Sequence, residues 1–349
     1  MHDQFLWLRQ GLLIGVGSVG KHHAKIMASR YENLFLVDPA PEVAEWLKGN
    51  IKSEYKIFGS LSEAISALSP NTSSTTAVIS HLAPDHFDAF TMLVDAGVRH
   101  IVCEKPISDS LVAGRAMVDR ADRANIRFTV GFPRRFLDTS KIINAISLSE
   151  LGGPPSAIVV HGGAKCLITF GAHFVDLALD IFGSPPLRVA GFGSSQPINP
   201  RRKDLGYWEG SLSWEFTGNR FLSVTFTNQS SVQAIGVIYA PHGIMNLYPD
   251  GKVTMVKRNM EEIAKDPRVT RVGICVDSPV EIVPPSSASE LNVILDEIES
   301  DSDISYSSNL ILESLEASIG GLIAAETKQV VEFPVSKAHP LYGKSWNVT

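Results

Sequence analysis

Gly15-Val16-Gly17-Ser18-Val19-Gly20 is the most informative segment of this 349-residue chain. The apolar residues 11–14 before it predict a buried parallel strand, and residues 18–30 after it carry apolar side chains at helical spacing. A G-x-G-x-x-G turn between a strand and a helix is typical of dinucleotide binding. Gly15 permits the tight turn, Gly17 leaves room for a pyrophosphate, and Gly20 lets the helix pack closely on the sheet. The N–H groups at the helix start then face the phosphates.

An acidic residue follows the turn at the spacing expected for a ribose contact. Leu34-Phe35-Leu36-Val37-Asp38 predicts a second strand that ends in a carboxylate, and Asp38 lies 18 positions after Gly20. A carboxylate at this place accepts hydrogen bonds from both ribose hydroxyls and repels a 2′-phosphate, and no arginine follows it closely. We therefore expect NAD rather than NADP. The alternative interpretation is a glycine-rich turn without a ligand, followed by a surface aspartate.

Strand and helix patterns alternate through the first 135 residues. Further buried strands are predicted at residues 76–80, 100–104 and 127–132, with helices between them. This alternation predicts a parallel sheet with helices on both faces, the doubly wound Rossmann arrangement, in which ligands bind beyond the carboxyl ends of the strands. We therefore expect the cofactor to contact the glycine turn and residues that follow the strands: Gly15, Gly17, Ser18, Val19, Gly20, Asp38, His81, Pro84, His86, Glu104 and Lys105.

The pattern changes after Arg135, which divides the chain into a nucleotide-binding domain at residues 1–135 and a second domain at residues 136–349. Helices are predicted near residues 139–148, 171–182, 287–299 and 307–326. Strand patterns flank Gly218-Asn219 and Asp250-Gly251, and such turns indicate hairpins. Hairpins in place of crossovers predict an α+β domain with an open, mainly antiparallel sheet.

An open sheet leaves edges and one face that need cover. A symmetric partner is the usual cover, so we expect a homodimer or homotetramer assembled through the second domain. The apolar alternation of Leu212, Trp214 and Phe216 within this sheet supports that expectation.

The composition excludes several classes of function. The net charge of −6 argues against a nucleic-acid partner, which would need a basic patch. Cys103, Cys166 and Cys275 are far apart and form no C-x-x-C pair, so we expect neither a metal site nor a disulfide framework, and we infer a reducing, cytoplasmic location. Residues 1–10 make a poor signal peptide, and no apolar run approaches the roughly 18 residues of a membrane span.

Two residues are candidates for acid–base chemistry. Lys105 follows a parallel strand, where burial would lower its pKa and Glu104 would raise it, and it can donate a hydrogen bond to a substrate oxygen or exchange a proton with it. His173 lies near a helix start, which favours the neutral form that suits a general base, and Asp176 shares its helix face. The alternative interpretations are a surface ion pair for Lys105 and a core histidine for His173.

The chain resembles the Gfo/Idh/MocA oxidoreductases. The resemblance rests on the order and spacing of five motifs: Gly15-Val16-Gly17-Ser18-Val19-Gly20-Lys21, Ala83-Pro84-Asp85-His86, Glu104-Lys105-Pro106, Gly131-Phe132 with Arg135-Phe136, and Gly171-Ala172-His173-Phe174-Val175-Asp176. It implies a Rossmann domain, a C-terminal open-sheet domain that mediates oligomerisation, and NAD(P)-dependent redox chemistry on sugars, polyols or related compounds. It also implies that Lys105 and His173 are the catalytic pair.

One position departs from the family's pattern. The family often has an aspartate four residues before the catalytic histidine, where this chain has Thr169. Thr169 carries no charge, so the usual Asp–His proton relay is absent. We expect Thr169, His173, Asp176 and Arg135 to contact the substrate, Arg135 through a polar or anionic group.

The sequence therefore predicts hydride transfer between NAD and a carbohydrate-like alcohol or ketone. Two alternatives stay open. One is an NAD-binding regulatory protein without turnover, and the other is a glycoside-cleaving enzyme that retains its NAD. The identity of the substrate does not follow from the sequence.

Overall fold

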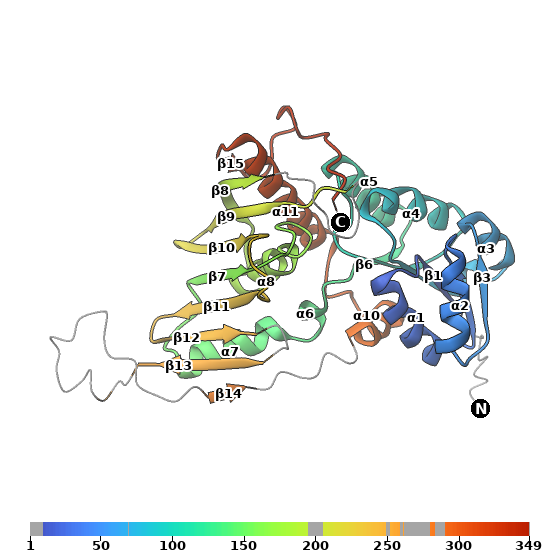
Figure 1. Cartoon of the computed structure of the whole chain (residues 1–349), viewed down its shortest axis with the longest axis horizontal. Helices are drawn as coiled ribbons and strands as arrows, with labels where there is room; N and C mark the ends of the chain where they lie inside the picture. Colours follow the sequence, from blue (N-terminus) through green and yellow to red (C-terminus); the bar gives the residue numbers. More distant parts are fainter. Residues whose placement is uncertain are drawn as a thin grey trace. The chain divides into compact units, whose positions relative to one another are not determined.

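The computed structural model contains two compact units, each built around its own sheet (Figure 1). Unit 1 comprises Met1–Pro133, Ser289–Leu315 and Gly343–Thr349, and unit 2 comprises Arg134–Ala288 and Glu316–Tyr342. The residues that the structure describes are 10–68, 70–194, 205–248, 252–258, 261, 280–282 and 290–348.

The division into units is discontinuous along the chain. Its first boundary, after Pro133, lies two residues before the one predicted after Arg135. Two later segments, which the sequence placed in the second domain, group with unit 1. One includes Glu299, whose carboxylate accepts hydrogen bonds from Arg30 and Tyr31. The other includes Trp346, whose backbone N–H donates to the carbonyl of Asp109.

The sheet of unit 1 has six described strands in the order β3-β2-β1-β4-β5-β6, and every pair is parallel. The strands are β1 (Gln10–Ile14), β2 (Asn33–Val37), β3 (Tyr55–Phe58), β4 (Thr75–Ile79), β5 (His100–Cys103) and β6 (Arg127–Val130). The strand order reverses between the neighbouring strands β1 and β4. Sheets of this kind bind dinucleotides at the point of reversal. The predicted doubly wound fold is confirmed.

Helices cover both faces of this sheet, and its central strands β1 and β4 accordingly end in the buried apolar runs 12–14 and 77–79. Helices α1 and α10 pack on one face, with α2 beside α1, and α3, α4 and α5 pack on the other. The helical segments are α1 (Ser18–Arg30), α2 (Pro41–Asn50), α3 (Leu61–Leu68), η1 (Thr72–Ser74), η2 (Ala83–Asp85), α4 (His86–Asp95), α5 (Leu111–Arg123) and α10 (Glu290–Glu299).

The sheet of unit 2 has nine described strands in the order β14-β13-β12-β11-β7-β10-β9-β8-β15 (Figure 1). They are β7 (Ala157–Gly162), β8 (Pro186–Ser194), β9 (Glu209–Phe216), β10 (Arg220–Phe226), β11 (Ile235–Ala240), β12 (Gly243–Leu247), β13 (Val253–Lys257), β14 (Val280–Ile282) and β15 (Val331–Glu332). Strands β7 and β10 run parallel, and the other described pairs are antiparallel. The predicted open, mainly antiparallel sheet is confirmed.

Both predicted hairpins form in this sheet. Strands β9 and β10 are joined through Gly218 and Asn219, both at positive φ, and β12 pairs with β13. The turn at Asp250-Gly251 lies outside the described residues, as does Cys275. The other helices whose bounds the structure describes are α6 (Pro133–Phe136), α7 (Thr139–Glu150), α8 (Ala172–Phe182) and α11 (Ser308–Thr327), of which α6 and α11 span the unit boundaries.

The apolar alternation of β9 faces the helices of unit 2. Leu212, Trp214 and Phe216 are buried, and the indole N–H of Trp214 donates to the carbonyl of Ala317 in α11 at 2.9 Å. These three residues therefore belong to the core of unit 2. Taking their alternation as support for a partner interface was wrong. The period-2 pattern identifies a buried face but cannot tell whether helices or a partner bury it.

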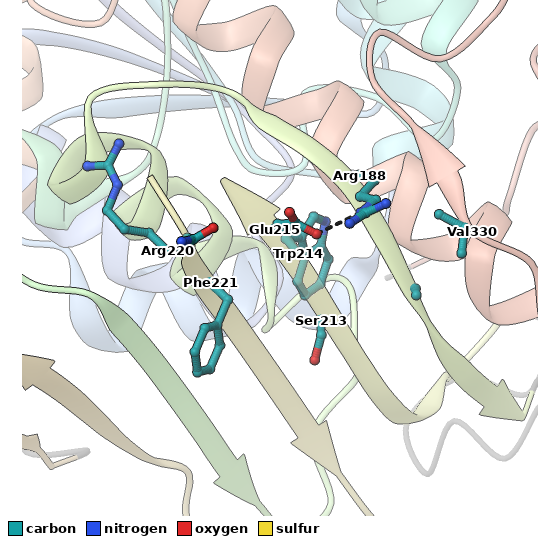
Figure 2. Close-up of a pocket in the computed structure, with 9 residues that line it drawn as sticks. Arg188, Ser213, Trp214, Glu215, Arg220, Phe221 and Val330 are labelled. Carbon is teal, nitrogen blue, oxygen red and sulfur yellow. Dashed lines mark hydrogen bonds and ion pairs between the residues drawn. The ribbon is translucent and has the colours of Figure 1, made fainter. Parts of the chain in front are cut away.

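The opposite face of this sheet, the open face, carries exposed side chains in the described strands β8, β9 and β10. Figure 2 shows a hollow on it, where the guanidinium of Arg188 donates to the Glu215 carboxylate at 2.6 Å and Phe221 and Val330 are exposed. Hydroxyl side chains pair across β9 and β10 on the same face, as in the 3.1 Å contact between Ser213 and Ser223. Among the described helices, none combines the length and apolar character needed to cross a membrane.

Candidate functional site

The glycine turn has three glycines with three different surroundings. Gly15 has φ of +88°, and a Cβ added there would lie 2.7 Å from the backbone nitrogen of His81. A Cβ on Gly20 would lie 2.1 Å from the carbonyl oxygen of Gly15, so α1 can approach β1 only because this side chain is missing. A Cβ on Gly17 would meet no described atom within 4 Å. The fold therefore requires Gly15 and Gly20, whereas Gly17 keeps the space beyond the N-terminus of α1 open, as a pyrophosphate needs.

Asp38 holds the glycine turn against the end of β2. Its Oδ2 accepts the N–H of Val16 at 2.8 Å, and its Oδ1 accepts the N–H of Ala40 at 2.9 Å. A carboxylate offers about four acceptor positions, so these bonds leave capacity for ribose hydroxyls. The remaining acceptor positions of Asp38 suit the ribose of NAD. Asp38 also stabilises the glycine turn through Val16, a role that the sequence did not reveal.

Two histidines stack at the carboxyl end of β4, with their ring centroids 5.3 Å apart. His86 is buried, and burial lowers its pKa, so its ring is neutral. Its Nε2 lies 3.2 Å from the carbonyl oxygen of His81, and its Nδ1 lies 3.1 Å from the carbonyl oxygen of Ile107 and 3.2 Å from Cys103 Sγ. A neutral ring carries one N–H, so it donates to one of the two carbonyls. Burial and the neighbouring His86 lower the pKa of His81 to about 4, so both rings are uncharged near pH 7.

Glu104 and Lys105 follow β5 at the same edge of the sheet. The Glu104 carboxylate accepts the Lys105 N–H through Oε2 at 3.2 Å and contacts His23 Nε2 through Oε1 at 2.7 Å. Burial by itself would raise the pKa of Glu104, but the hydrogen bond and charge of His23 and the charge of Lys105 outweigh it and hold that pKa below its usual range. Glu104 is therefore an anion near neutral pH.

In unit 2, Thr169 and His173 lie where the chain enters α8. A tight turn over residues 167–170 leads into this helix, and the N–H of His173 donates to the carbonyl of Phe170 at 3.2 Å. His173 is partly exposed and lies edge-on to the Phe170 ring, whereas Thr169 is buried. Gly183, in the left-handed conformation, ends α8 where the sequence predicted the helix to stop.

Arg135 and Asp176 form a buried ion pair. The guanidinium donates to Asp176 Oδ1 and to Asp180 Oδ1, each at 2.8 Å, and the Ser140 hydroxyl donates to the other oxygen of Asp180. The side chains of Arg135 and Asp176 are 5% and 2% exposed. The pair thus ties α6 and α7 to α8, on which His173 lies.

Two cations near α8 were not singled out from the sequence as substrate ligands. The Arg134 guanidinium lies 4.8 Å from the centroid of the Phe174 ring, and the Lys165 ammonium lies 5.1 Å from that of Phe170. The two phenyl rings are 5.9 Å apart. A cationic and aromatic surface therefore adjoins His173.

The structure divides the predicted residues between the units. The cofactor candidates of unit 1 follow the carboxyl ends of β1, β2, β4 and β5 and gather at one edge of a single sheet: Gly15, Gly17, Ser18, Val19, Gly20, Asp38, His81, Pro84, His86, Glu104 and Lys105. The remaining candidates, Arg135, Thr169, His173 and Asp176, belong to unit 2. Sequence reasoning missed His23, although a histidine in line with the buried Gly20, Ala24 and Met27 of α1 was a visible sign. In the described part of the chain, no three His, Cys, Asp or Glu side chains gather as a metal site would require.

Comparisons with known proteins agree with this geometry. Residues 10–132 match the model of an oxidoreductase family with an NAD-binding Rossmann fold, GFO_IDH_MocA. The glucose-6-phosphate 3-dehydrogenase of Bacillus subtilis is 26% identical over 160 residues, which are 43% of this chain and 41% of that protein. The D-glucoside 3-dehydrogenase of Escherichia coli is 26% identical over 174 residues, 43% of this chain and 49% of that protein. The matched segments thus span less than half the length of these relatives.

The fold of nearly the whole chain is shared with a solved structure. UDP-N-acetylglucosamine 3-dehydrogenase GnnA from Acidithiobacillus ferrooxidans superposes with a TM-score of 0.67 at 16% identity. The match covers 92% of this chain and 99% of the other. At this identity the likeness establishes the two-unit fold and no more.

Proposed function

Because residues 10–132 belong to the oxidoreductase family with the NAD-binding Rossmann fold, we propose that this chain transfers a hydride between NAD and a carbohydrate-like alcohol or ketone. The observation that carries the proposal is the common edge of the unit 1 sheet, where the glycine turn, Asp38 and Lys105 follow the ends of β1, β2 and β5. When bound, NAD supplies the hydride-transferring carbon.

The cofactor-binding residues act through the backbone and through charge. The N-terminus of α1 offers its first N–H groups to the pyrophosphate, over the space that Gly17 keeps open. Asp38 accepts the ribose hydroxyls and repels a 2′-phosphate, which is why we propose NAD over NADP. The neutral rings of His81 and His86, with Pro84 between them in the chain, line the next strand end without adding charge.

Lys105 and His173 handle the proton in this proposal. In the oxidation direction, one of them takes the proton of the substrate hydroxyl, and the Lys105 ammonium stabilises the oxygen while negative charge develops on it. Thr169 supplies no negative charge to His173, so Lys105 carries the larger share. Replacing Thr169 by Asp is then expected to change the pH dependence of kcat.

The relatives and the cations of unit 2 support a substrate class within this proposal. Both sequence relatives described above are named as sugar 3-dehydrogenases, so we propose the 3-hydroxyl of a pyranoside as the reacting group. Arg135 is committed to Asp176 and Asp180 and supports α8, so we assign the contact with an anionic substrate group to Arg134 and Lys165 instead. A phosphorylated sugar is therefore expected to have a lower KM than its neutral parent, and Lys165→Ala is expected to reduce that difference.

Thr169 favours a second candidate, an NAD-binding regulatory protein without turnover. A glycoside-cleaving enzyme with retained NAD is a third candidate, because one relative acts on D-glucosides. The test is a panel of glucose, glucose 6-phosphate, D-glucosides, myo-inositol and UDP-N-acetylglucosamine, each with free NAD. NADH absorbance that grows through many turnovers supports the dehydrogenase, cleavage without NADH supports retained NAD, and binding without either product supports the regulatory protein.

We also propose that a second copy of this chain covers the open face of the unit 2 sheet. That face carries the exposed rings of Phe192 and Phe221 beside the Arg188–Glu215 ion pair, so it offers apolar surface and both signs of charge to an identical face. Equilibrium sedimentation is expected to show a dimer or tetramer at micromolar concentration. Phe221→Glu is expected to shift it to monomer, and a wild-type monomer would contradict the proposal.

A further inference from the structure

His23 contributes a buried polar group to the candidate site of unit 1. It lies one helical turn after Gly20 on α1 and is 8% exposed. Its Nε2 is 2.7 Å from Glu104 Oε1, whereas its Nδ1 contacts no hydrogen-bond partner among the described residues. The polar interaction of this ring is therefore directed at the Glu104 carboxylate.

The Glu104 carboxylate connects His23 to the backbone N–H of Lys105. Glu104 uses its second oxygen, Oε2, to accept the Lys105 N–H at 3.2 Å, and its own N–H donates to the carbonyl of Ile79 at 2.8 Å. The carboxylate lies next to Gly131, where an added Cβ would be 3.5 Å from Oε1. Rotation of the Glu104 side chain would break the contacts at both oxygens together.

We propose that His23 is a positioning residue for Lys105, acting through Glu104. By fixing one carboxylate oxygen, His23 aims the other at the Lys105 N–H and so sets the direction in which the lysine side chain leaves the strand end. The helix that offers its N-terminus to the cofactor is thereby linked to the lysine that acts on the substrate. The kinetic consequence rests on the proposed function, whereas the structural link does not.

The electrostatics around Glu104 agree with this role. The Glu104 side chain is 17% exposed, and its carboxylate stays ionised because His23 of α1 and Lys105 stabilise its charge. It also interacts with His86 of α4 and Cys103 of β5. An anion with so little exposure to water requires hydrogen-bond donors. Removing the donor at His23 therefore leaves the carboxylate free to reorient toward Lys105 or solvent.

The direct test is the backbone amide of Lys105. In deuterated protein with ¹⁵N-lysine, TROSY spectra assigned with Lys105→Arg give its shift and its rate of exchange with solvent. His23→Ala is expected to move this resonance and speed the exchange about tenfold or more, since a charge-assisted bond is weakened. His23→Gln, which retains an N–H donor, is expected to restore much of the wild-type behaviour. His22→Ala removes the exposed neighbouring histidine and is expected to change nothing.

If His23→Ala does not fold, His23→Leu removes the donor while filling the space. A Lys105 amide that behaves as wild type in either folded variant would overturn the inference.

The second readout is kinetic. With a substrate from the panel, His23→Ala is expected to lower kcat about 10- to 100-fold, the cost of slightly misplacing a reacting group, and to leave the KM for NAD within about twofold. An unchanged kcat would contradict the positioning role. If the wild type oxidises no compound on the panel, the proposed function fails while the amide measurement still decides the link from His23 to Lys105.

Discussion

Replacing Gly17 by alanine should separate cofactor binding from folding. Gly17 has φ of −70° and ψ of −155°, which alanine adopts readily, and its added Cβ would meet no described atom within 4 Å. Alanine is a weaker N-cap than glycine, which destabilises α1, but it also lowers the conformational entropy of the unfolded chain, which stabilises the fold. The two effects oppose each other, so we expect the free energy of unfolding to change by less than about 0.5 kcal/mol.

The same methyl group occupies the space assigned to the pyrophosphate. Overpacking of this kind costs about 1–3 kcal/mol, so the affinity for NADH should fall about 5- to 150-fold. Fluorescence titration with NADH and thermal unfolding measure the two quantities.

Two other glycines are the controls. Gly49→Ala, on an exposed turn of α2 where a Cβ also meets nothing, should leave NADH binding unchanged. Gly20→Ala should destabilise the fold itself, because its Cβ would lie 2.1 Å from the Gly15 carbonyl oxygen. A Gly17→Ala protein that binds NADH as tightly as wild type would refute the placement of the pyrophosphate.

Three further outcomes follow from the described contacts. Asp38→Ala should weaken NADH binding by about 1.5–3 kcal/mol, the value of a hydrogen bond to a charged group. A wild type that binds NADPH more tightly than NADH in the same titration would contradict the NAD assignment. Arg135→Ala leaves the buried Asp176 carboxylate without its ion pair and should lower the free energy of unfolding, measured by urea denaturation, by about 3–5 kcal/mol. A loss below about 1 kcal/mol would contradict that structural role. The unfolded chain protonates His81 near pH 6.5 but the folded chain only near pH 4, so unfolded protein binds more protons between these values and stability falls as the pH is lowered through them. His81→Asn should flatten this fall by on the order of 1–3 kcal/mol, measured as unfolding free energy against pH, and identical slopes in the two proteins would be the contrary result.

Much of unit 1 was predictable because its strands are continuous apolar runs that end in polar residues. The glycine turn, Asp38 and the Glu104-Lys105 pair fall at strand ends, and parallel strands bring their ends to one edge. The edge strand β3, Tyr55–Phe58, was not predicted, because its residues are only half-buried and leave little hydrophobic pattern.

Unit 2 was less predictable because its order depends on distant pairings. Strands β7 and β10 are parallel neighbours although more than 50 residues separate them, and no local pattern encodes that register. The grouping of α10 with unit 1 depends on contacts of Glu299 with Arg30 and Tyr31, which lie 269 and 268 positions away in the sequence.

The candidate site shows the same limit. Residue types and motifs identified Lys105 and His173, but not the partners that surround them. Arg135 was expected to meet substrate, and its commitment to Asp176 could be known only once α6 and α8 were placed together. His23 was passed over because its partner, Glu104, lies 81 positions away.

The most direct test of the account compares wild type with Lys105→Ala in one assay. NADH formation from NAD and the best substrate of the sugar panel is followed by absorbance, with NADH affinity measured on the same samples. We predict that the wild type reduces many equivalents of NAD and that Lys105→Ala is slower by about 10²–10⁴-fold, the range for an acid–base group, at nearly unchanged NADH affinity. A Lys105→Ala enzyme that retains most of its activity, or a wild type that binds NADH but oxidises none of the sugars, would contradict the account.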